Sequence, residues 1–175
     1  MKKILYVILS IVVVFLSVMM VKRLRVIKKQ YSIKKQMDRL KGKEYEIIGK
    51  MRRVTSENSK IGNLCGTKNN YKLIYEMNFD CSVCLVKLNS IYDLYLKLLK
   101  SHKIGFFIVS NESSDSYIKY FLNRKLGNYD IWVINQKPLS DGTDLYLLDK
   151  SNKIIIAGDV WDYPFLRKEY LKRFK

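Results

Sequence analysis

Cys81 and Cys84, separated by Ser82 and Val83, are the residues best suited by type and spacing to carry out chemistry in this 175-residue chain. Two cysteines at this spacing serve in three kinds of structure: a thiol pair that alternates with a disulfide, half of a zinc site, or two small core residues. A redox pair needs a first thiol that ionises easily and a second thiol within reach of it. The elements that flank the pair therefore decide which chemistry is favoured.

The cysteine pair lies between a segment typical of a β-strand and a segment typical of a helix. Residues 71–79 are rich in aromatic and branched side chains, and residues 82–100 carry apolar side chains at spacings of three and four. Cys81 would then lie at a helix N-terminus, where free N–H groups and the helix dipole favour a thiolate. Cys84 would lie one turn later, placed to attack a mixed disulfide. This pattern favours Cys81 as nucleophile and Cys84 as resolving thiol.

The remainder of the chain predicts an alternation of strands and helices. Residues 43–54 alternate weakly and are a candidate strand. The later elements are a buried strand at 104–110, a helix at 114–126, a strand at 129–135, a hairpin at 144–160 and a helix at 162–174. From residue 71 onward the order is β-α-β-α-β-β-β-α. The early βαβ units predict parallel strands with right-handed crossovers, and the fold class is α/β, with helices on both faces of a mixed sheet.

Two stretches carry a family resemblance: "LIYEMNFDCSVCLVKL" at 73–88 and "LYLLDKSNKIIIAGDV" at 145–160. Together with the element order, they resemble the thioredoxin-like superfamily over residues 71–174, and are most similar to membrane-anchored thiol-disulfide oxidoreductases of the TlpA and ResA type. The resemblance implies a thioredoxin-like domain at residues 42–175. It implies protein thiols and disulfides as substrates, an upstream electron donor, and no cofactor beyond the redox-active disulfide.

Three positions depart from the pattern of that family. Asp80 stands where the family has Trp before the first cysteine, and Val83 stands where it has Pro before the second. Thr143 occupies the place of the substrate-docking cis-proline, because Pro138 comes five residues too early. We expect the Asp80 carboxylate to raise the pKa of Cys81, and Thr143 to offer a hydroxyl toward that thiol. These departures motivate an alternative function: an anchored thioredoxin-fold binding module whose catalysis has decayed.

A metal site would need further ligands, and the sequence offers few. Besides the cysteine pair, only Cys65 and the sole histidine, His102, could complete a zinc site of four ligands. His102 follows a predicted helix, where interaction with the C-terminal dipole is the simpler interpretation. Cys65 lies in a segment rich in Gly and Asn and is the odd thiol, either unpaired or paired between molecules. We therefore expect no metal.

The N-terminal residues predict a membrane anchor followed by a basic stalk. Residues 4–21 form a run of 18 residues without a charge, which as a helix would be about 27 Å long, close to the thickness of a bilayer core. No small-residue cleavage pattern follows this run, so residues 1–21 are expected to remain as an uncleaved single-pass anchor. Residues 22–41 have amphipathic helical spacing, and Gly42 is expected to end that helix.

The charge distribution bears on partners and on location. Lys and Arg number 33 against 16 acidic residues, and residues 21–60 alone hold 14 basic and 4 acidic residues. Because this excess flanks the apolar run, it favours membrane lipid over nucleic acid as its partner. Taken alone, the flanking charges place the C-terminal domain in the cytoplasm. The family resemblance implies the other side, and we expect a single-pass inner-membrane protein with a periplasmic domain.

Overall fold

The structure is a computed structural model that describes residues 2–56, 70–100, 103–111, 115–138, 145–161 and 163–173. The chain divides into two compact units, Met1–Arg39 and Leu40–Lys175. Each unit is described by itself below.

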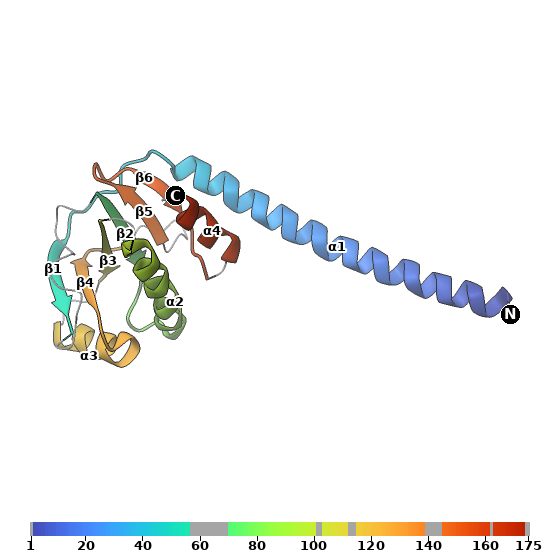
Figure 1. Ribbon diagram of the computed structural model, residues 1–175, viewed down its shortest axis with the longest axis horizontal. Helices are drawn as coiled ribbons and strands as arrows, with labels where there is room; N and C mark the ends of the chain where they lie inside the picture. The colour runs from blue at the N-terminus through green and yellow to red at the C-terminus, as the bar shows by residue number, and fades with distance from the viewer. Residues whose placement is uncertain are drawn as a thin grey trace. The chain divides into compact units, whose positions relative to one another are not determined.

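The N-terminal unit is one long helix. Helix α1 spans Lys2–Leu40 without a break, so the predicted anchor and stalk form a continuous helix (Figure 1). Every side chain described between residues 9 and 21 is exposed. Gly42 follows the helix with a φ of 83°, a conformation that glycine adopts without strain. Within the described part of the chain, none of the helices is both long and apolar enough to span a bilayer.

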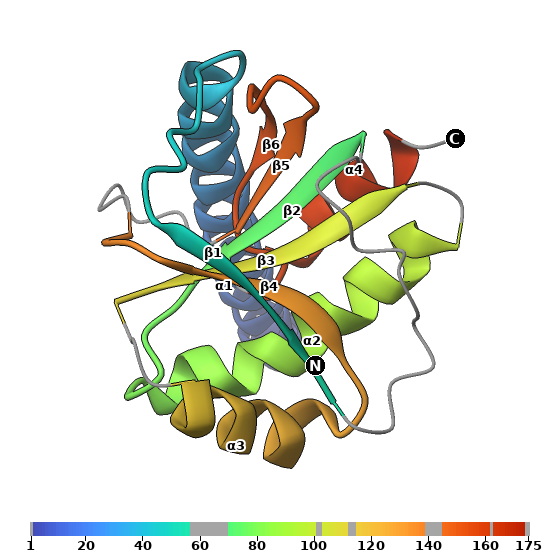
Figure 2. The same cartoon turned by 90° about the vertical axis from the view of Figure 1, so that its left-hand side faces the viewer.

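The second unit is built on a six-stranded mixed sheet with the strand order β1-β4-β3-β2-β5-β6 (Figure 2). Strands β2, β3 and β4 are parallel, and β1, β5 and β6 pair antiparallel with their neighbours. The strand bounds are β1 Lys50–Thr55, β2 Tyr71–Glu76, β3 Ile104–Ser110, β4 Asp130–Asn135, β5 Leu145–Asp149 and β6 Ile154–Ala157. The predicted strands and the terminal hairpin are confirmed, and the candidate strand at 43–54 is confined to its second half.

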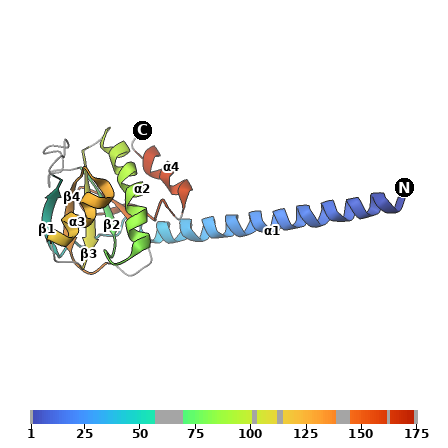
Figure 3. The same cartoon turned by 90° about the horizontal axis from the view of Figure 1, so that it is seen from below.

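Among its described residues, this unit also contains three helices: α2 Ser82–Leu99, α3 Asp115–Leu126 and α4 Pro164–Lys172. Figures 1 and 3 show α2 and α4 on the same side of the sheet, and α3 contacts α2. The parallel strands step in one direction, from β2 to β3 to β4, so right-handed crossovers place α2 and α3 on one face. The expectation of helices on both faces is therefore wrong for the described elements of Leu40–Lys175.

The opposite face of the sheet is covered by the segment that follows α1. Tyr45 is fully buried there, packed in a cluster with Ile74, Phe107 and Tyr146, and Ile47 packs against the same cluster. The Tyr45 hydroxyl donates a hydrogen bond of 2.6 Å to Glu76 Oε1. Both faces of β3 are thus buried, as its continuous apolar run predicts.

Helix α2 is fixed to the sheet by aromatic packing. Phe106, from β3, packs against both Tyr92 and Tyr95 of α2, with ring centroids 5.7 and 5.3 Å away. Such pairs contribute about 0.5–1.5 kcal/mol each beyond the area they bury. This packing holds the axis of α2, and hence the position of its N-terminus, against the centre of the sheet.

Candidate functional site

A tight turn at the carboxyl end of β2 carries the chain to Cys81. The side chains of Met77 and Phe79 are buried and anchor this turn. Asn78 forms it: its Oδ1 accepts a hydrogen bond of 2.9 Å from the backbone N–H of Asp80, and its carbonyl accepts one of 3.0 Å from that of Cys81. The turn places Cys81 at the start of α2, at the carboxyl edge of the parallel strands, where α/β sheets bind their ligands.

Cys81 is the N-cap of α2. Its backbone is extended, with φ −86° and ψ 106°, and its Sγ accepts a hydrogen bond of 3.2 Å from the backbone N–H of Cys84. A sulfur atom here occupies the place that a Ser or Asp oxygen takes in most helices. No disulfide joins Cys81 and Cys84, and both side chains are half-buried. The structure thus confirms the predicted placement of the pair, with Cys81 at the helix N-terminus and Cys84 one turn later.

This environment lowers the pKa of Cys81 below its ordinary value. The largest cause is a hydrogen bond with the Cys84 side chain, and partial burial opposes it. The backbone N–H groups of Cys84 and Val83 and the positive charge of Lys87 lower the pKa of Cys81 further. All these lowering interactions favour the thiolate, the form that acts as nucleophile.

The expected effect of Asp80 is not found. Its carboxylate is absent from the causes that shift the pKa of Cys81, which moves downward and not upward. The side chain of Asp80 is exposed, and its Oδ1 accepts a long hydrogen bond of 3.5 Å from the Tyr117 hydroxyl of α3. An exposed carboxylate is surrounded by water, which screens its charge from the neighbouring thiol.

A buried tyrosine of the sheet binds the first turn of α2. The hydroxyl of Tyr75, a fully buried residue of β2, donates a hydrogen bond of 3.0 Å to the carbonyl of Cys84. Ser82 and Val83 lie on the outer side of that turn and are exposed. The resolving cysteine is therefore fixed by its backbone, while the residues between the cysteines face solvent.

A buried ion pair lies one turn further along α2, and sequence reasoning missed it. Lys87 is 7% exposed and Asp159, just after β6, is 4% exposed. The Lys87 Nζ lies 2.6 Å from Asp159 Oδ2, so the two charges form an ion pair. The angles at Oδ2 do not meet the geometry of a hydrogen bond. The available signal was a lysine beside Leu85 and Leu88, on the face of the predicted helix that otherwise carries apolar residues.

The other predicted site residues have different outcomes. Thr143, Cys65 and His102 lie outside the described residues, so the docking role of Thr143 and the roles of the other two remain predictions. Among the residues that the structure does describe, no group of three or more His, Cys, Asp or Glu side chains is arranged to hold a metal ion.

Comparison with solved structures identifies the fold. The thioredoxin domain of a thiol-disulfide oxidoreductase from Bacteroides vulgatus superposes with a TM-score of 0.50 at 15% identity, covering 77% of this chain and 98% of that one. A proposed protein disulfide isomerase from Bacteroides thetaiotaomicron gives 0.50 at 14% identity, covering 76% and 89%. The chain has the thioredoxin-like fold. No family model matches the sequence, and no curated protein matches it.

Within the thioredoxin-like fold, the arrangement around the cysteines is consistent with the resemblance seen in the sequence. The pair follows the central strand β2 and begins α2, and the antiparallel strands β5 and β6 lie on the other side of β2. Asp159, at the end of that hairpin, reaches α2 through Lys87. The helix of the cysteines and the terminal hairpin are therefore joined directly beside the thiols.

Proposed function

We propose that this protein is a thiol-disulfide oxidoreductase that acts through Cys81 and Cys84. The observation that carries the proposal is the Cys81 Sγ at the N-terminus of α2, which accepts the backbone N–H of Cys84 at 3.2 Å and has a lowered pKa. A thiolate stabilised in this way at a half-exposed position is chemically competent to attack a disulfide.

The reaction proceeds in two balanced exchanges. The Cys81 thiolate attacks one sulfur of a substrate disulfide; that S–S bond breaks, a mixed disulfide forms, and the departing substrate thiolate takes a proton from solvent. Cys84 then loses its proton and attacks the Cys81 sulfur, which forms the Cys81–Cys84 disulfide and releases the second substrate thiol. The substrate gains two electrons and the protein loses two.

A second turnover requires a dithiol reductant, supplied by an electron-donor protein, that reduces the Cys81–Cys84 disulfide by the same chemistry. We propose protein disulfides as substrates and no metal or organic cofactor. The exposed residues Ser82 and Val83 lie between the two thiols and face the incoming substrate. Thr143 is retained in this proposal as the residue that docks the substrate backbone.

The experiment that tests this function is a redox titration of the full chain in detergent. The protein is equilibrated in glutathione buffers of stepped ratio, trapped with an alkylating reagent and weighed by mass spectrometry. We expect a reversible two-electron transition between Cys81 and Cys84, between roughly −300 and −100 mV. Replacing Cys81 with Ser should abolish both the transition and disulfide exchange with a model peptide.

A binding module without turnover is the second candidate function, favoured by Asp80 and Val83 in place of the family's Trp and Pro. For this candidate, we expect that Cys81 and Cys84 form no disulfide in the titration. It also expects partner capture that is equally efficient with wild-type protein and with the variant Cys81→Ser/Cys84→Ser. A reversible thiol transition that is lost in Cys81→Ser excludes this candidate.

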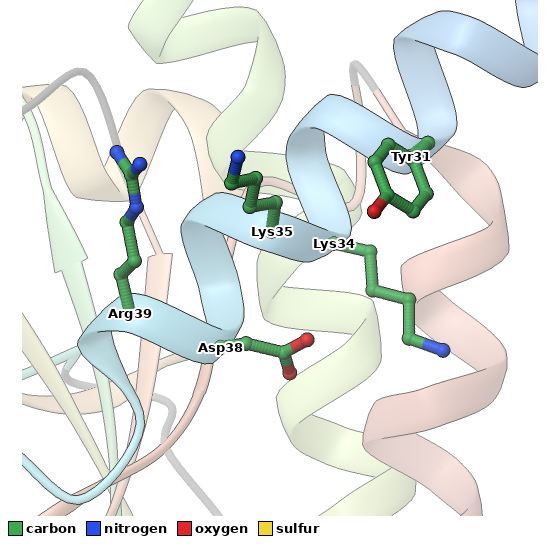
Figure 4. Close-up of a pocket in the computed structure, with 5 residues that line it drawn as sticks. All are labelled: Tyr31, Lys34, Lys35, Asp38 and Arg39. Carbon is green, nitrogen blue, oxygen red and sulfur yellow. The ribbon is translucent and has the colours of Figure 1, made fainter.

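We further propose that α1 tethers the domain to the inner membrane, with the domain on the periplasmic side. The proposal is supported by the uncharged run at residues 4–21 and by the exposed apolar side chains described between residues 9 and 21. Basic side chains follow on the same helix. Lys34, Lys35 and Arg39 line a depression of about 540 Å³ together with Tyr31 and Asp38 (Figure 4), a composition suited to anionic headgroups.

Two measurements test the tether. The full chain should sediment together with anionic vesicles. A variant with Lys34, Lys35 and Arg39 replaced by Gln should bind the vesicles more weakly at low salt. A thiol reagent that cannot cross the inner membrane should label Cys81 in intact spheroplasts. Protection of Cys81 there, with labelling after lysis, would place the domain in the cytoplasm and agree with the charge bias.

A further inference from the structure

The ion pair between Lys87 and Asp159 has no role in the reaction as described above. We propose that Lys87 is a positioning residue for the thiol chemistry: its ammonium, held by Asp159 beside the first turns of α2, stabilises the ionised form of Cys81. Asp159 moderates that effect by partly neutralising the same ammonium. This inference rests on the proposed oxidoreductase function and adds residues that set its reactivity.

The helix places Lys87 where its charge can reach the thiols. Lys87 follows Cys84 by three residues, and side chains at that spacing are neighbours on a helix surface, with Cβ atoms about 5–6 Å apart. Cys81 lies one turn earlier, with its Sγ bound to the backbone N–H of Cys84. Because Lys87 is 7% exposed, little water separates its charge from the half-buried sulfur atoms.

Asp159 is held in place by other contacts. Its Oδ1 accepts a hydrogen bond of 2.7 Å from the backbone N–H of Trp161. Its charge also acts on Tyr170 of α4, whose pKa is raised well above its ordinary value by burial and by Asp159. The hydrogen bond from Trp161 therefore fixes the carboxylate at the end of the hairpin, where it meets the ammonium of Lys87 on α2. It cannot follow the Lys87 side chain freely, so the ammonium is held close to the cysteines.

A purely structural role explains this pair poorly. Removing two charges from water is costly, and well-packed apolar residues often replace a buried ion pair without loss of stability. The buried Asp159 Oδ2 lies 2.6 Å from the ammonium but without hydrogen-bond geometry, which is a weak arrangement for stability alone. Its location one turn from a nucleophilic thiol supplies a reason for a cation at this position.

Other ionisable groups also surround Cys81, and their effects differ from that of Lys87. Asp80 is adjacent in sequence but exposed, and its contact is with Tyr117. The Tyr75 hydroxyl donates to the Cys84 carbonyl, and the Tyr170 hydroxyl donates to the carbonyls of Leu145 and Gly158. Among the groups named, Lys87 is the cation whose charge acts on the Cys81 thiol.

The test measures how fast iodoacetamide alkylates Cys81 in the reduced full chain, in detergent, between pH 5 and 10, with the site identified by peptide mass. Lys87→Met should raise the apparent pKa of Cys81 by a fraction of a unit, which slows alkylation about two- to threefold at pH values well below that pKa. Asp159→Asn should shift the pKa in the opposite direction, because the ammonium then acts without its counter-charge. Lys87→Arg should restore the wild-type profile.

Opposite shifts from the two partners of one contact are the expected signature, since structural damage would move both variants in the same direction. Lys97→Met removes a lysine from an exposed position on the same helix and should leave the profile unchanged. Shifts of the same sign, no shift in either variant, or a Lys87→Arg profile that resembles Lys87→Met would overturn the proposal. Should Lys87→Met fail to fold, the Asp159→Asn and Lys87→Arg profiles still decide.

Failure of this inference can be distinguished from failure of the proposed function. Alkylation reports ionisation of Cys81 and needs no turnover. If wild-type protein never forms the Cys81–Cys84 disulfide, the oxidoreductase function fails whatever the alkylation profiles show. If the disulfide forms reversibly but the two variants do not shift in opposite directions, the function stands and the role of Lys87 fails.

Discussion

In the described part of the chain, two ion pairs with a buried carboxylate lie at opposite ends of the sheet, and the two carboxylates are bound differently. Arg53 on β1 binds Asp130 on β4 through two hydrogen bonds, of 2.9 and 2.6 Å, and the hydroxyl of Thr55 donates a third to the same carboxylate at 3.3 Å. In the second pair, the Lys87 ammonium lies 2.6 Å from Asp159 Oδ2. The first pair lies at the amino end of β4, whereas the second lies beside the cysteines, at the carboxyl end of β2.

This difference indicates that Arg53–Asp130 stabilises the fold, whereas Lys87–Asp159 acts on the cysteine site. We call Arg53–Asp130 the fastening pair. The planar guanidinium of Arg53 matches a carboxylate at two points, and such pairs are among the strongest charge contacts. It joins the edge strand β1 to the parallel core. Lysine offers a compact charge without that fixed geometry, which suits a neighbour whose own charge changes during a reaction.

Breaking the fastening pair should produce the largest effect on stability. Asp130→Ala removes three hydrogen bonds to a buried carboxylate, two of them from the guanidinium of Arg53, and we expect a loss of about 3 kcal/mol in the free energy of unfolding. Urea denaturation followed by circular dichroism measures this loss. The alkylation profile of Cys81 should be unchanged in the folded fraction; a shifted profile would show that the two ends of the sheet are not independent.

Replacing the second pair with apolar residues should separate stability from reactivity. In Lys87→Met/Asp159→Leu both charges are removed together, so neither partner is left unpaired, and the free energy of unfolding should stay within about 2 kcal/mol of wild type. Alkylation of Cys81 should nevertheless follow a higher pKa than in wild type, because the nearby cation is gone. A stability loss as large as that of Asp130→Ala would instead make this pair a fastening contact like the first.

The contrast between the two pairs also shows what sequence could and could not predict. The strands and helices around the site follow from local patterns: the continuous apolar run of β3, the spacing in α2 and the turn at residues 150–152. The placement of Cys81 at the start of α2 follows from the same patterns. These features depend on residues close together in the chain, which is why sequence could predict them.

What the sequence could not predict depends on distant contacts. Lys87 and Asp159 are 72 positions apart, and no periodic pattern relates them. The segment around Tyr45 covers a face of the sheet that was assigned to helices. Gly49 passes so close to β4 in this segment that a Cβ would lie 2.3 Å from the Asn135 carbonyl oxygen, a contact between residues 86 positions apart. The expected increase in the pKa of Cys81 from Asp80 is not found because the Asp80 side chain is exposed, and the folded turn determines that exposure.

Alkaline conditions should destabilise the folded protein through Tyr170 of α4. Burial and the Asp159 charge raise the pKa of Tyr170 well above its ordinary value, so the unfolded chain ionises first. The contribution of a neutral Tyr170 is therefore fully present below about pH 10 and is lost as pH rises beyond it, by about 1.4 kcal/mol per pH unit. Urea titrations at pH 9, 10 and 11 should show a steeper loss in wild type than in Tyr170→Phe.

The smallest effect is expected at Asp80, the carboxylate nearest to Cys81 in sequence. Because Asp80 is exposed, its charge is screened by water and salt, and Asp80→Asn should change the alkylation rate of Cys81 by less than about twofold at neutral pH. Lys87 is farther away in sequence but buried, and its removal should change the rate by more than that. Paired alkylation measurements at low and at high salt decide the matter. A shift from Asp80→Asn equal to that from Lys87→Met would mean that proximity in sequence, and not burial, determines which charge acts on the thiol.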